Sequence, residues 1–303
     1  MTFRTLEDDI TIMLPEDFDL EANLGYLTRE KNECMYEIED GFITKAIAIE
    51  KARFLIQISV IANKQMVVRF LDAAQPVEEW HREEIVKYIR EWFDLDRDIT
   101  PFYKIAEADP LLKTPVEKFR GLRVIGIPDL FEALCWGVLG QQINIAFAYT
   151  LKKQLVEAFG ECMEWKGKKY WIFPSYKQIS QRTTSDFSNI KMTLRKSEYV
   201  IGIAKLMASG EISKEELMKM SFQDAEKKLT QIRGVGPWTA HYVLMRCLRF
   251  GSAFPIDDVG LMNAIKVLRK MDRKPTKNEI MALSASWKNW ESYATFYLWR
   301  TLY

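Results

Sequence analysis

The sequence contains few of the residues that build metal centres and disulfide frameworks. Its 303 residues include four cysteines and two histidines. The cysteines lie far apart and form no CxxC pair, which argues against zinc or an iron–sulfur cluster held by clustered thiolates. Scattered single cysteines are typically small buried residues, so we expect neither a metal site nor a disulfide. The cysteines are Cys34, Cys135, Cys162 and Cys247.

Long hydrophobic runs and sorting signals are also missing. Apolar runs such as 133–140 are far shorter than the roughly 18 residues that a membrane helix needs. The first 15 residues carry Glu7, Asp8 and Asp9, with no basic stretch followed by a continuous apolar run, so no secretory signal is expected. The sequence therefore predicts a cytoplasmic protein without a membrane partner.

The net charge of +1 conceals an asymmetry along the chain. Residues 1–120 carry 16 Lys and Arg against 25 Asp and Glu, whereas residues 121–303 carry 27 against 17. A basic C-terminal part is typical of a protein that binds nucleic-acid phosphates. A solvated basic surface without a partner would give the same count.

Hydrophobic patterning predicts two domains in an α+β chain. In residues 1–105, β-rich stretches at 10–14, 46–49, 52–61 and 66–71 alternate with helical patterns at 18–30 and 77–93, which indicates an α+β domain with an antiparallel sheet. Residues 106–303 are expected to form an all-α domain, and no low-complexity linker separates the two. Helices are expected at 129–159, 196–209, 213–220, 221–232, 238–248, 258–271, 277–283 and 287–302.

A five-residue turn from Arg233 to Pro237 joins two of these helices and reads RGVGP. Its two glycines allow the backbone to approach a phosphate, and the N–H groups that open the second helix point outward toward it. Proline suits the first position of that helix. The turn is therefore a candidate for binding DNA without reading its sequence, although a simple interhelical turn has the same composition.

The text that follows the turn resembles a known family. Residues 232–265 read IRGVGPWTAHYVLMRCLRFGSAFPIDDVGLMNAI, which resembles the helix-hairpin-helix and following aspartate of base-excision DNA glycosylases. Further similarity lies in LGQQINIAFA at 139–148, WKNWESYATFYLW at 287–299 and FDLDRDI at 93–99. Together these segments resemble AlkA-type DNA-3-methyladenine glycosylases over nearly the whole chain.

That resemblance implies an architecture and an activity. Residues 1–105 would form the TBP-like N-terminal domain of the family and residues 106–303 the helix-hairpin-helix glycosylase domain. The protein would flip alkylated purines out of duplex DNA and excise them in base-excision repair, with 3-methyladenine, 7-methylguanine and hypoxanthine as candidate substrates. It would act as a monomer without a cofactor, apart from a monovalent cation at the hairpin carbonyls.

By the same resemblance, Asp258 is the catalytic residue. A carboxylate beside the sugar can stabilise the positive charge that develops there, orient the attacking water, or do both. Asp257, immediately before it, is expected to cap the next helix or to support Asp258. Read from the residues alone, either aspartate could merely cap the helix.

The resemblance also assigns an aromatic pocket for the flipped base. Stacking on electron-rich rings favours bases that methylation has made cationic. Each ring taken singly could equally belong to the core, and one of them comes from the N-terminal part, which places the pocket between the domains. The expected lining residues are Trp238, Tyr242, Trp299 and Tyr26.

Two further sets of DNA contacts follow from the family pattern. Gln142 matches the wedge that fills the gap left by the flipped base, unless it is an ordinary exposed helix residue, and Gln141 is expected to be structural. The phosphate-binding residues of the hairpin are Gly234, Val235, Gly236 and Thr239. The family often has Pro and Arg where this chain has Asn289 and Glu291, so phosphate contacts are not carried over to that segment.

One residue type is missing at a telling position. Glycosylases that also nick the strand use a lysine just after the second glycine of the hairpin to form a Schiff base, and here those places hold Pro237 and Trp238. We therefore expect a monofunctional enzyme that leaves an abasic site. Two alternatives stay open: a non-catalytic DNA-binding module, and an oxidised-purine glycosylase, which shares the domain plan but normally carries that lysine.

Overall fold

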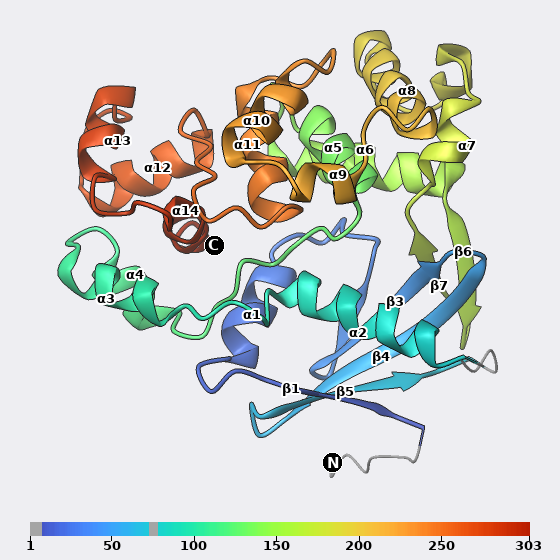
Figure 1. Ribbon diagram of the computed structural model, residues 1–303, viewed down its shortest axis with the longest axis horizontal. Coiled ribbons are helices and arrows are strands. Elements are labelled where there is room, and N and C mark those ends of the chain that lie inside the picture. Colours follow the sequence, from blue (N-terminus) through green and yellow to red (C-terminus); the bar gives the residue numbers. More distant parts are fainter. Residues whose placement is uncertain (1–7, 73–77) are drawn as a thin grey trace.

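The computed structural model describes residues 8–72 and 78–303 (Figure 1). Glu7 and Val77, which belong to the predicted N-terminal stretch and to the start of a predicted helix, lie outside the described residues. The predicted α+β class and the N-terminal antiparallel sheet are confirmed. None of the helices in the described ranges has the length and apolarity needed to cross a membrane.

The N-terminal sheet has five antiparallel strands in the order β1-β5-β4-β3-β2. The central strands are rich in Ile, Val and Phe, which suit a pleated, half-buried surface. Helix α2 (Glu79–Phe93) packs against the sheet through Ile85, Ile89, Trp92 and Phe93, all of which are buried. The strands are β1 (Ile10–Met13), β2 (Glu37–Glu39), β3 (Phe42–Ile49), β4 (Ala52–Ile61) and β5 (Gln65–Phe70).

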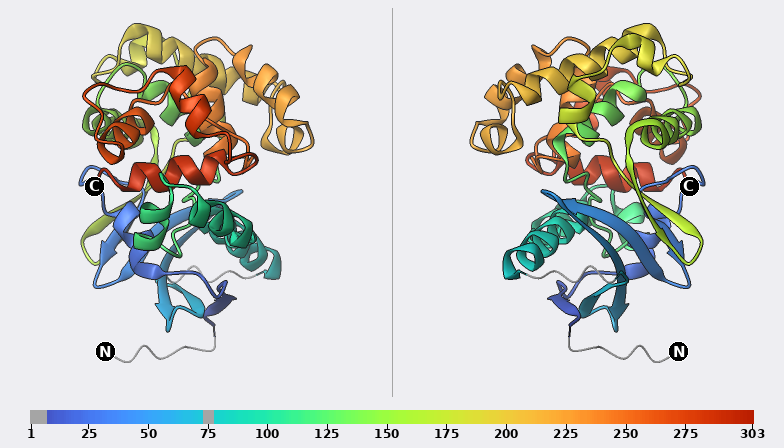
Figure 2. Two further views of the ribbon diagram at one scale, coloured as in Figure 1. Left: turned by 90° about the vertical axis from the view of Figure 1, so that its left-hand side faces the viewer. Right: turned by 90° about the vertical axis from the view of Figure 1, so that its right-hand side faces the viewer.

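The remaining helices form a second layer above the sheet, and Figures 1 and 2 show α1 (Leu20–Leu27) and α14 (Glu291–Arg300) at the junction. One apolar cluster runs from Ile10 in β1 to Trp299 in α14, so the two parts pack directly against each other, as predicted. The helices of the second part are α3 (Thr100–Ala108), α4 (Lys113–Lys118), α5 (Leu130–Leu139), α6 (Ile145–Phe159), α7 (Tyr176–Ser180), α8 (Leu194–Ala208), α9 (Lys214–Met218), α10 (Phe222–Thr230), α11 (Pro237–Arg246), α12 (Val259–Leu268) and α13 (Lys277–Leu283), with a 3-10 turn at Thr184–Phe187.

The helix predicted over 129–159 is in fact two helices. α5 ends at Leu139, and α6 starts after the side chain of Asn144 accepts a hydrogen bond from the amide of Phe147. Between them Gln142 adopts a left-handed conformation with φ 57°. Only residues 140–144, which read GQQIN, separate two strongly helical patterns, so a single helix was expected.

The helical part also contains a β-hairpin, so the expectation that it would be all-α was incomplete. β6 (Glu161–Trp165) and β7 (Lys168–Ile172) pair antiparallel through a turn at Lys166 and Gly167, both with positive φ. The hairpin extends down to the N-terminal sheet, where β7 lies against β3 (Figure 1). It therefore forms a second connection between the two parts.

Candidate functional site

The predicted hairpin turn forms between α10 and α11. Gly234 has φ 93°, and a Cβ placed on it would lie 2.3 Å from the ring of Tyr199, so only glycine fits there. Pro237 is the first residue of α11, as expected. Val235 is buried, and its amide donates to the carbonyl of Ile232 at 2.9 Å.

Asp258 is the best-held carboxylate near this hairpin. Its Oδ1 accepts from the amide of Leu261 at 2.7 Å, which makes it the N-cap of α12. The same oxygen accepts from the indole of Trp299 at 2.7 Å, and Oδ2 accepts from the indole of Trp238 at 2.9 Å. Donors from three different helices therefore fix the orientation of the carboxylate.

Of the two roles expected for Asp257, capping the helix is wrong, because Asp258 is the cap, and support of Asp258 stays a prediction. Asp257 is exposed and forms an ion pair with Lys277 at 3.2 Å. The two neighbouring carboxylates therefore have separate surroundings. The capping role and the candidate catalytic role fall on the same residue.

The four predicted pocket aromatics lie in one continuous cluster. The ring centroids of Trp238 and Tyr242 are 5.6 Å apart, and those of Tyr242 and Trp299 are 6.2 Å apart. Trp238 and Trp299 hold Asp258, whereas Tyr242 and Tyr26 line a cavity behind it. The cluster therefore connects the carboxylate to an internal space between the two parts of the chain.

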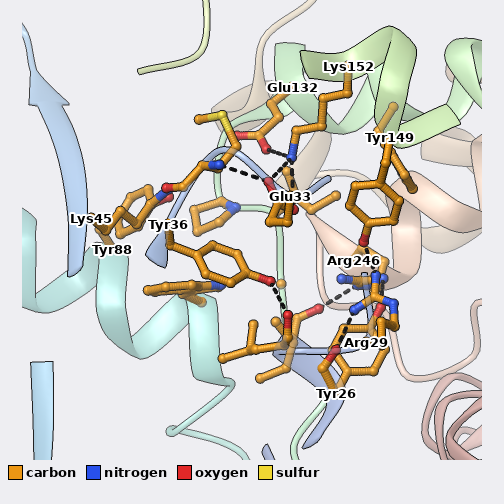
Figure 3. Close-up of a pocket in the computed structure, with 18 of the residues that line it drawn as sticks. Tyr26, Arg29, Glu33, Tyr36, Lys45, Tyr88, Glu132, Tyr149, Lys152 and Arg246 are labelled. Carbon is orange, nitrogen blue, oxygen red and sulfur yellow. Dashed lines mark hydrogen bonds and ion pairs between the residues drawn. The ribbon is translucent and has the colours of Figure 1, made fainter. Parts of the chain in front are cut away.

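That cavity is far more charged than the sequence indicated (Figure 3). Arg246 of α11 donates through Nη1 to the hydroxyls of Tyr26, at 2.6 Å, and Tyr242, at 2.8 Å. The guanidinium of Arg29 lies 3.6 Å from the centre of the Tyr26 ring and donates to the hydroxyl of Tyr149. Six charged residues that the sequence did not single out line the cavity: Arg29, Glu33, Lys45, Glu132, Lys152 and Arg246.

A buried ion cluster occupies the other end of the cavity. The ammonium of Lys152 lies 3.0 Å from Glu132 and 3.3 Å from Glu33, and all three side chains are nearly buried. Burial is the largest influence on the pKa of Glu33 and would raise it, but Lys152, the amide of Met35 and the charge of Lys45 together outweigh burial, so the pKa lies below its usual value. Figure 3 shows this cluster on the opposite side of the cavity from Arg29 and Arg246.

Gln142, the predicted wedge, is exposed in the loop between α5 and α6 rather than in a helix. Its neighbour Gln141 is structural, as expected: its amide donates to the carbonyl of Gly234 at 2.8 Å and to the hydroxyl of Thr239 at 3.1 Å. Lys196 also holds the loop, donating to the carbonyls of Leu139 and Gln141. Hydrogen bonds therefore connect the loop at residues 140–144, called the wedge loop here, to the hairpin.

Some predicted residues contribute less directly. The side chain of Thr239 is buried, so it supports the hairpin from inside. Gly236 caps α11, and a Cβ there would meet nothing within 4 Å. Of the cysteines, Cys135 and Cys247 are buried, Cys34 is half-buried, and Cys162 is exposed, contrary to expectation. No cluster of three metal-ligating side chains occurs within residues 8–72 and 78–303.

The chain matches two family models and several named relatives. Residues 135–290 match the HhH-GPD superfamily of base excision DNA repair proteins, and residues 11–134 match the N-terminal domain of 8-oxoguanine DNA glycosylase. A DNA-3-methyladenine glycosylase of Bacillus subtilis is 70% identical over the whole of both chains. The chain is an AlkA-type member of the HhH-GPD superfamily. DNA-3-methyladenine glycosylase 2 of Escherichia coli is a more distant AlkA-type relative, 22% identical over 94% of each chain.

Solved structures of other DNA glycosylases share the fold of this chain. A 3-methyladenine DNA-glycosylase from Archaeoglobus fulgidus superposes with a TM-score of 0.83 at 23% identity, covering 96% of this chain and 97% of its own. An 8-oxoguanine glycosylase/lyase of Clostridium acetobutylicum superposes with a TM-score of 0.75 at 22% identity, covering 97% and 96%. At these identities the likeness establishes the fold alone.

Proposed function

We propose that this AlkA-type protein hydrolyses the glycosidic bond of alkylated purines in duplex DNA and leaves an abasic site. The observation that carries the proposal is the carboxylate of Asp258, which two indoles and a backbone amide hold at one end of an aromatic cluster. The full-length relative with 70% identity is named for 3-methyladenine excision, which supports the same substrate class. Base-excision repair is the process that such an activity serves.

The reaction needs little more than this carboxylate. As the bond between C1′ and the base breaks, its electron pair leaves with the base and positive charge develops on the sugar. Asp258 stabilises that charge and orients the water that attacks C1′. A cationic alkylated base departs as a neutral molecule, so no strong general acid is required. Such a carboxylate contributes about 3 kcal/mol, or roughly a hundredfold in rate.

The absence of strand nicking is part of the proposal. Pro237 and Trp238 stand where bifunctional members of the family carry a lysine, so no amine is available there for a Schiff base. The match of the N-terminal part to 8-oxoguanine glycosylases favours oxidised purines as a second candidate substrate. Borohydride captures the Schiff base that an oxidised-purine glycosylase with the hairpin lysine forms with the sugar. We expect no covalent complex with this protein.

Double-stranded DNA would contact the surface that joins the hairpin to the wedge loop. Gly234 and its neighbours would bind phosphate through backbone N–H groups, and the exposed side chain of Gln142 would enter the gap left by the flipped base. We expect a monomer, acting in the cytoplasm, with no cofactor beyond a monovalent cation at the hairpin carbonyls.

The test is the release of free bases from methylated duplex DNA, resolved by chromatography, with a parallel assay for nicking. Wild type should release 3-methyladenine and 7-methylguanine without nicking, and Asp258→Asn should be slower by roughly a hundredfold or more. Asp257→Asn is the matched control, because the carboxylate of Asp257 is next to Asp258 in the sequence but faces solvent and Lys277. DNA binding without release of any base by wild type would instead favour a non-catalytic clamp.

A further inference from the structure

Arg246 is a buried charge without a carboxylate. Only 4% of its surface is exposed, yet no Asp or Glu among the residues described here forms an ion pair with it. Its Nε donates to the carbonyl of Ile125 and its Nη1 to two tyrosines, whereas Nη2 donates to no described group. The guanidinium also packs against the rings of Tyr26, Tyr242 and Phe296. Because buried charges are normally paired and hydrogen-bonded, the spare Nη2 donor indicates a ligand in addition to this packing role.

The groups around Arg246 are donors as well. The hydroxyls of Tyr26 and Tyr242 accept from Arg246, and within the described ranges neither gives its own hydrogen to an acceptor. The hydroxyl of Tyr149 likewise accepts from Arg29 and donates to no acceptor within the described ranges. Burial raises the pKa of Tyr242 to about 12, so this phenol keeps its proton at neutral pH.

The two carboxylates that line the cavity bind donors at its other end. Glu33 receives Lys152 and the amides of Cys34 and Met35, and Glu132 receives Lys152. Both carboxylates lie away from Arg246 in Figure 3. At the end of the cavity that adjoins Tyr242, the polar side chains are therefore Arg246, Tyr26 and Tyr242. They offer the Nη2 donor of Arg246 and two phenolic hydrogens.

We propose that Arg246, with Tyr26 and Tyr242, selects flipped bases that present a carbonyl oxygen over bases that present an amino group. This inference rests on the proposed function and ranks its substrates. The O6 atom of 7-methylguanine would accept from Nη2 or from a phenol, whereas the N6 amino group of 3-methyladenine would bring a further donor against donors. A site built to donate discriminates strongly against a group that cannot accept.

Arg246, rather than Arg29, is the selecting residue because it is fixed. Three hydrogen bonds from two of its nitrogens hold its guanidinium in place. Arg29 is only half-buried, and its guanidinium covers the Tyr26 ring face at 3.6 Å. A base that stacks on Tyr26 would displace Arg29 but not Arg246.

The experiment compares two products from one sample of methylated duplex DNA under single-turnover conditions. Both bases are cationic in DNA, so repulsion by the guanidinium affects them alike, and the ratio of their release rates reports the group at position 6. In Arg246→Met the ratio of 7-methylguanine to 3-methyladenine release should fall about tenfold, the value of one lost hydrogen bond from a charged donor. Equal loss of both products, or a rise in the ratio, would overturn the proposal.

Two further variants separate selection from damage to the fold. Arg123→Met is the matched control: Arg123 is equally buried, but it pairs with Asp17 and does not line the cavity, so the ratio should stay that of wild type. Tyr242→Phe keeps the ring and removes one phenol, and should lower the ratio in the same direction even if Arg246→Met does not fold. If wild type releases neither base, the proposed function fails and not this selection.

Discussion

At the scale of single residues, the side chain of Asp258 accepts three hydrogen bonds that fix its orientation. It caps α12 and accepts from two indoles, so little freedom remains for its carboxylate. Gly260, two positions later, leaves room for this arrangement because it has no side chain. A Cβ placed on Gly260 would lie 2.9 Å from Oδ1 of Asp258 and 3.2 Å from the Trp299 ring.

Gly260→Ala should therefore lower activity much more than stability. Alanine in a helix is favoured over glycine by roughly 0.5–1 kcal/mol, which offsets a weakened N-cap worth about 1 kcal/mol, so the free energy of unfolding should change little. The added methyl group would push the carboxylate of Asp258 aside, and base release should slow about tenfold or more. Urea unfolding and single-turnover base release measure the two effects.

Gly202→Ala on α8 is the control for this substitution, because a Cβ there meets nothing within 4 Å. It should stabilise the helix without altering activity. A Gly260→Ala enzyme with wild-type turnover would show that the position of Asp258 tolerates displacement, and would weaken its assignment as the catalytic group.

The sequence predicted some site residues and missed others for a physical reason. Asp258 and Trp238 stand at fixed distances from a recognisable turn, so a motif can identify them. Arg246 lies in the apolar stretch YVLMRCL, and its role depends on Tyr26, 220 positions earlier in the chain. No local pattern reports such a contact, because the fold alone brings those two residues together.

At the scale of elements, the break between α5 and α6 shows what hydrophobic periodicity cannot detect. Helical patterns lie on both sides of the five residues 140–144, so a single helix over 129–159 was expected. The break arises from a left-handed residue and a capping asparagine, which are local conformational choices. The hairpin β6–β7 escaped notice similarly, since its five-residue strands are short.

The loop at that break depends on Lys196 of α8. Lys196→Met would remove the hydrogen bonds to the carbonyls of Leu139 and Gln141, which end α5 and position Gln142. We expect base flipping, followed by the fluorescence of 2-aminopurine beside the target base, to weaken severalfold. Stability should change by no more than about 1–2 kcal/mol, since two hydrogen bonds at the partly buried edge of the loop are lost.

Lys205→Met on the same helix is the matched control, because Lys205 is exposed and, within the described residues, its side chain forms no hydrogen bond or ion pair with the wedge loop or the hairpin. It removes the same charge from α8 and should leave flipping unchanged. Equal effects of the two substitutions would mean that the net charge of α8, and not the shape of the loop, governs flipping.

At the scale of the whole molecule, the two parts are joined by a core and by a buried ion cluster. Lys152 of α6 and Glu132 of α5 belong to the helical part, whereas Glu33 precedes β2 in the N-terminal part. Apolar contacts are non-directional, so on their own they would not fix the orientation of one part relative to the other. The cluster fixes their relative orientation, and with it the walls of the cavity that Tyr26 and Tyr242 share.

Lys152→Met should therefore destabilise the molecule in a pH-dependent way. At pH 7 the substitution leaves two nearly buried carboxylates unpaired, and the free energy of unfolding should fall by about 3 kcal/mol. In wild type the lowered pKa of Glu33 gives stability that is present above its usual value of 4.5 and is lost as the pH falls. In the variant, burial without Lys152 raises the pKa of Glu33, so the folded state gains stability as Glu33 protonates. The two urea unfolding curves should approach each other between pH 7 and pH 4.

The neighbouring lysine supplies the comparison that makes this prediction specific. Lys153 is exposed and lies 4.0 Å from Glu157, so Lys153→Met removes the same charge while leaving no buried group unpaired, and should cost less than about 0.5 kcal/mol at either pH. A deficit in Lys152→Met that stayed constant from pH 7 to pH 4 would show that lost packing of the lysine stem, and not the carboxylates, causes it. A deficit that closes in acid would establish that charge pairing across the two parts holds the walls of the cavity in place.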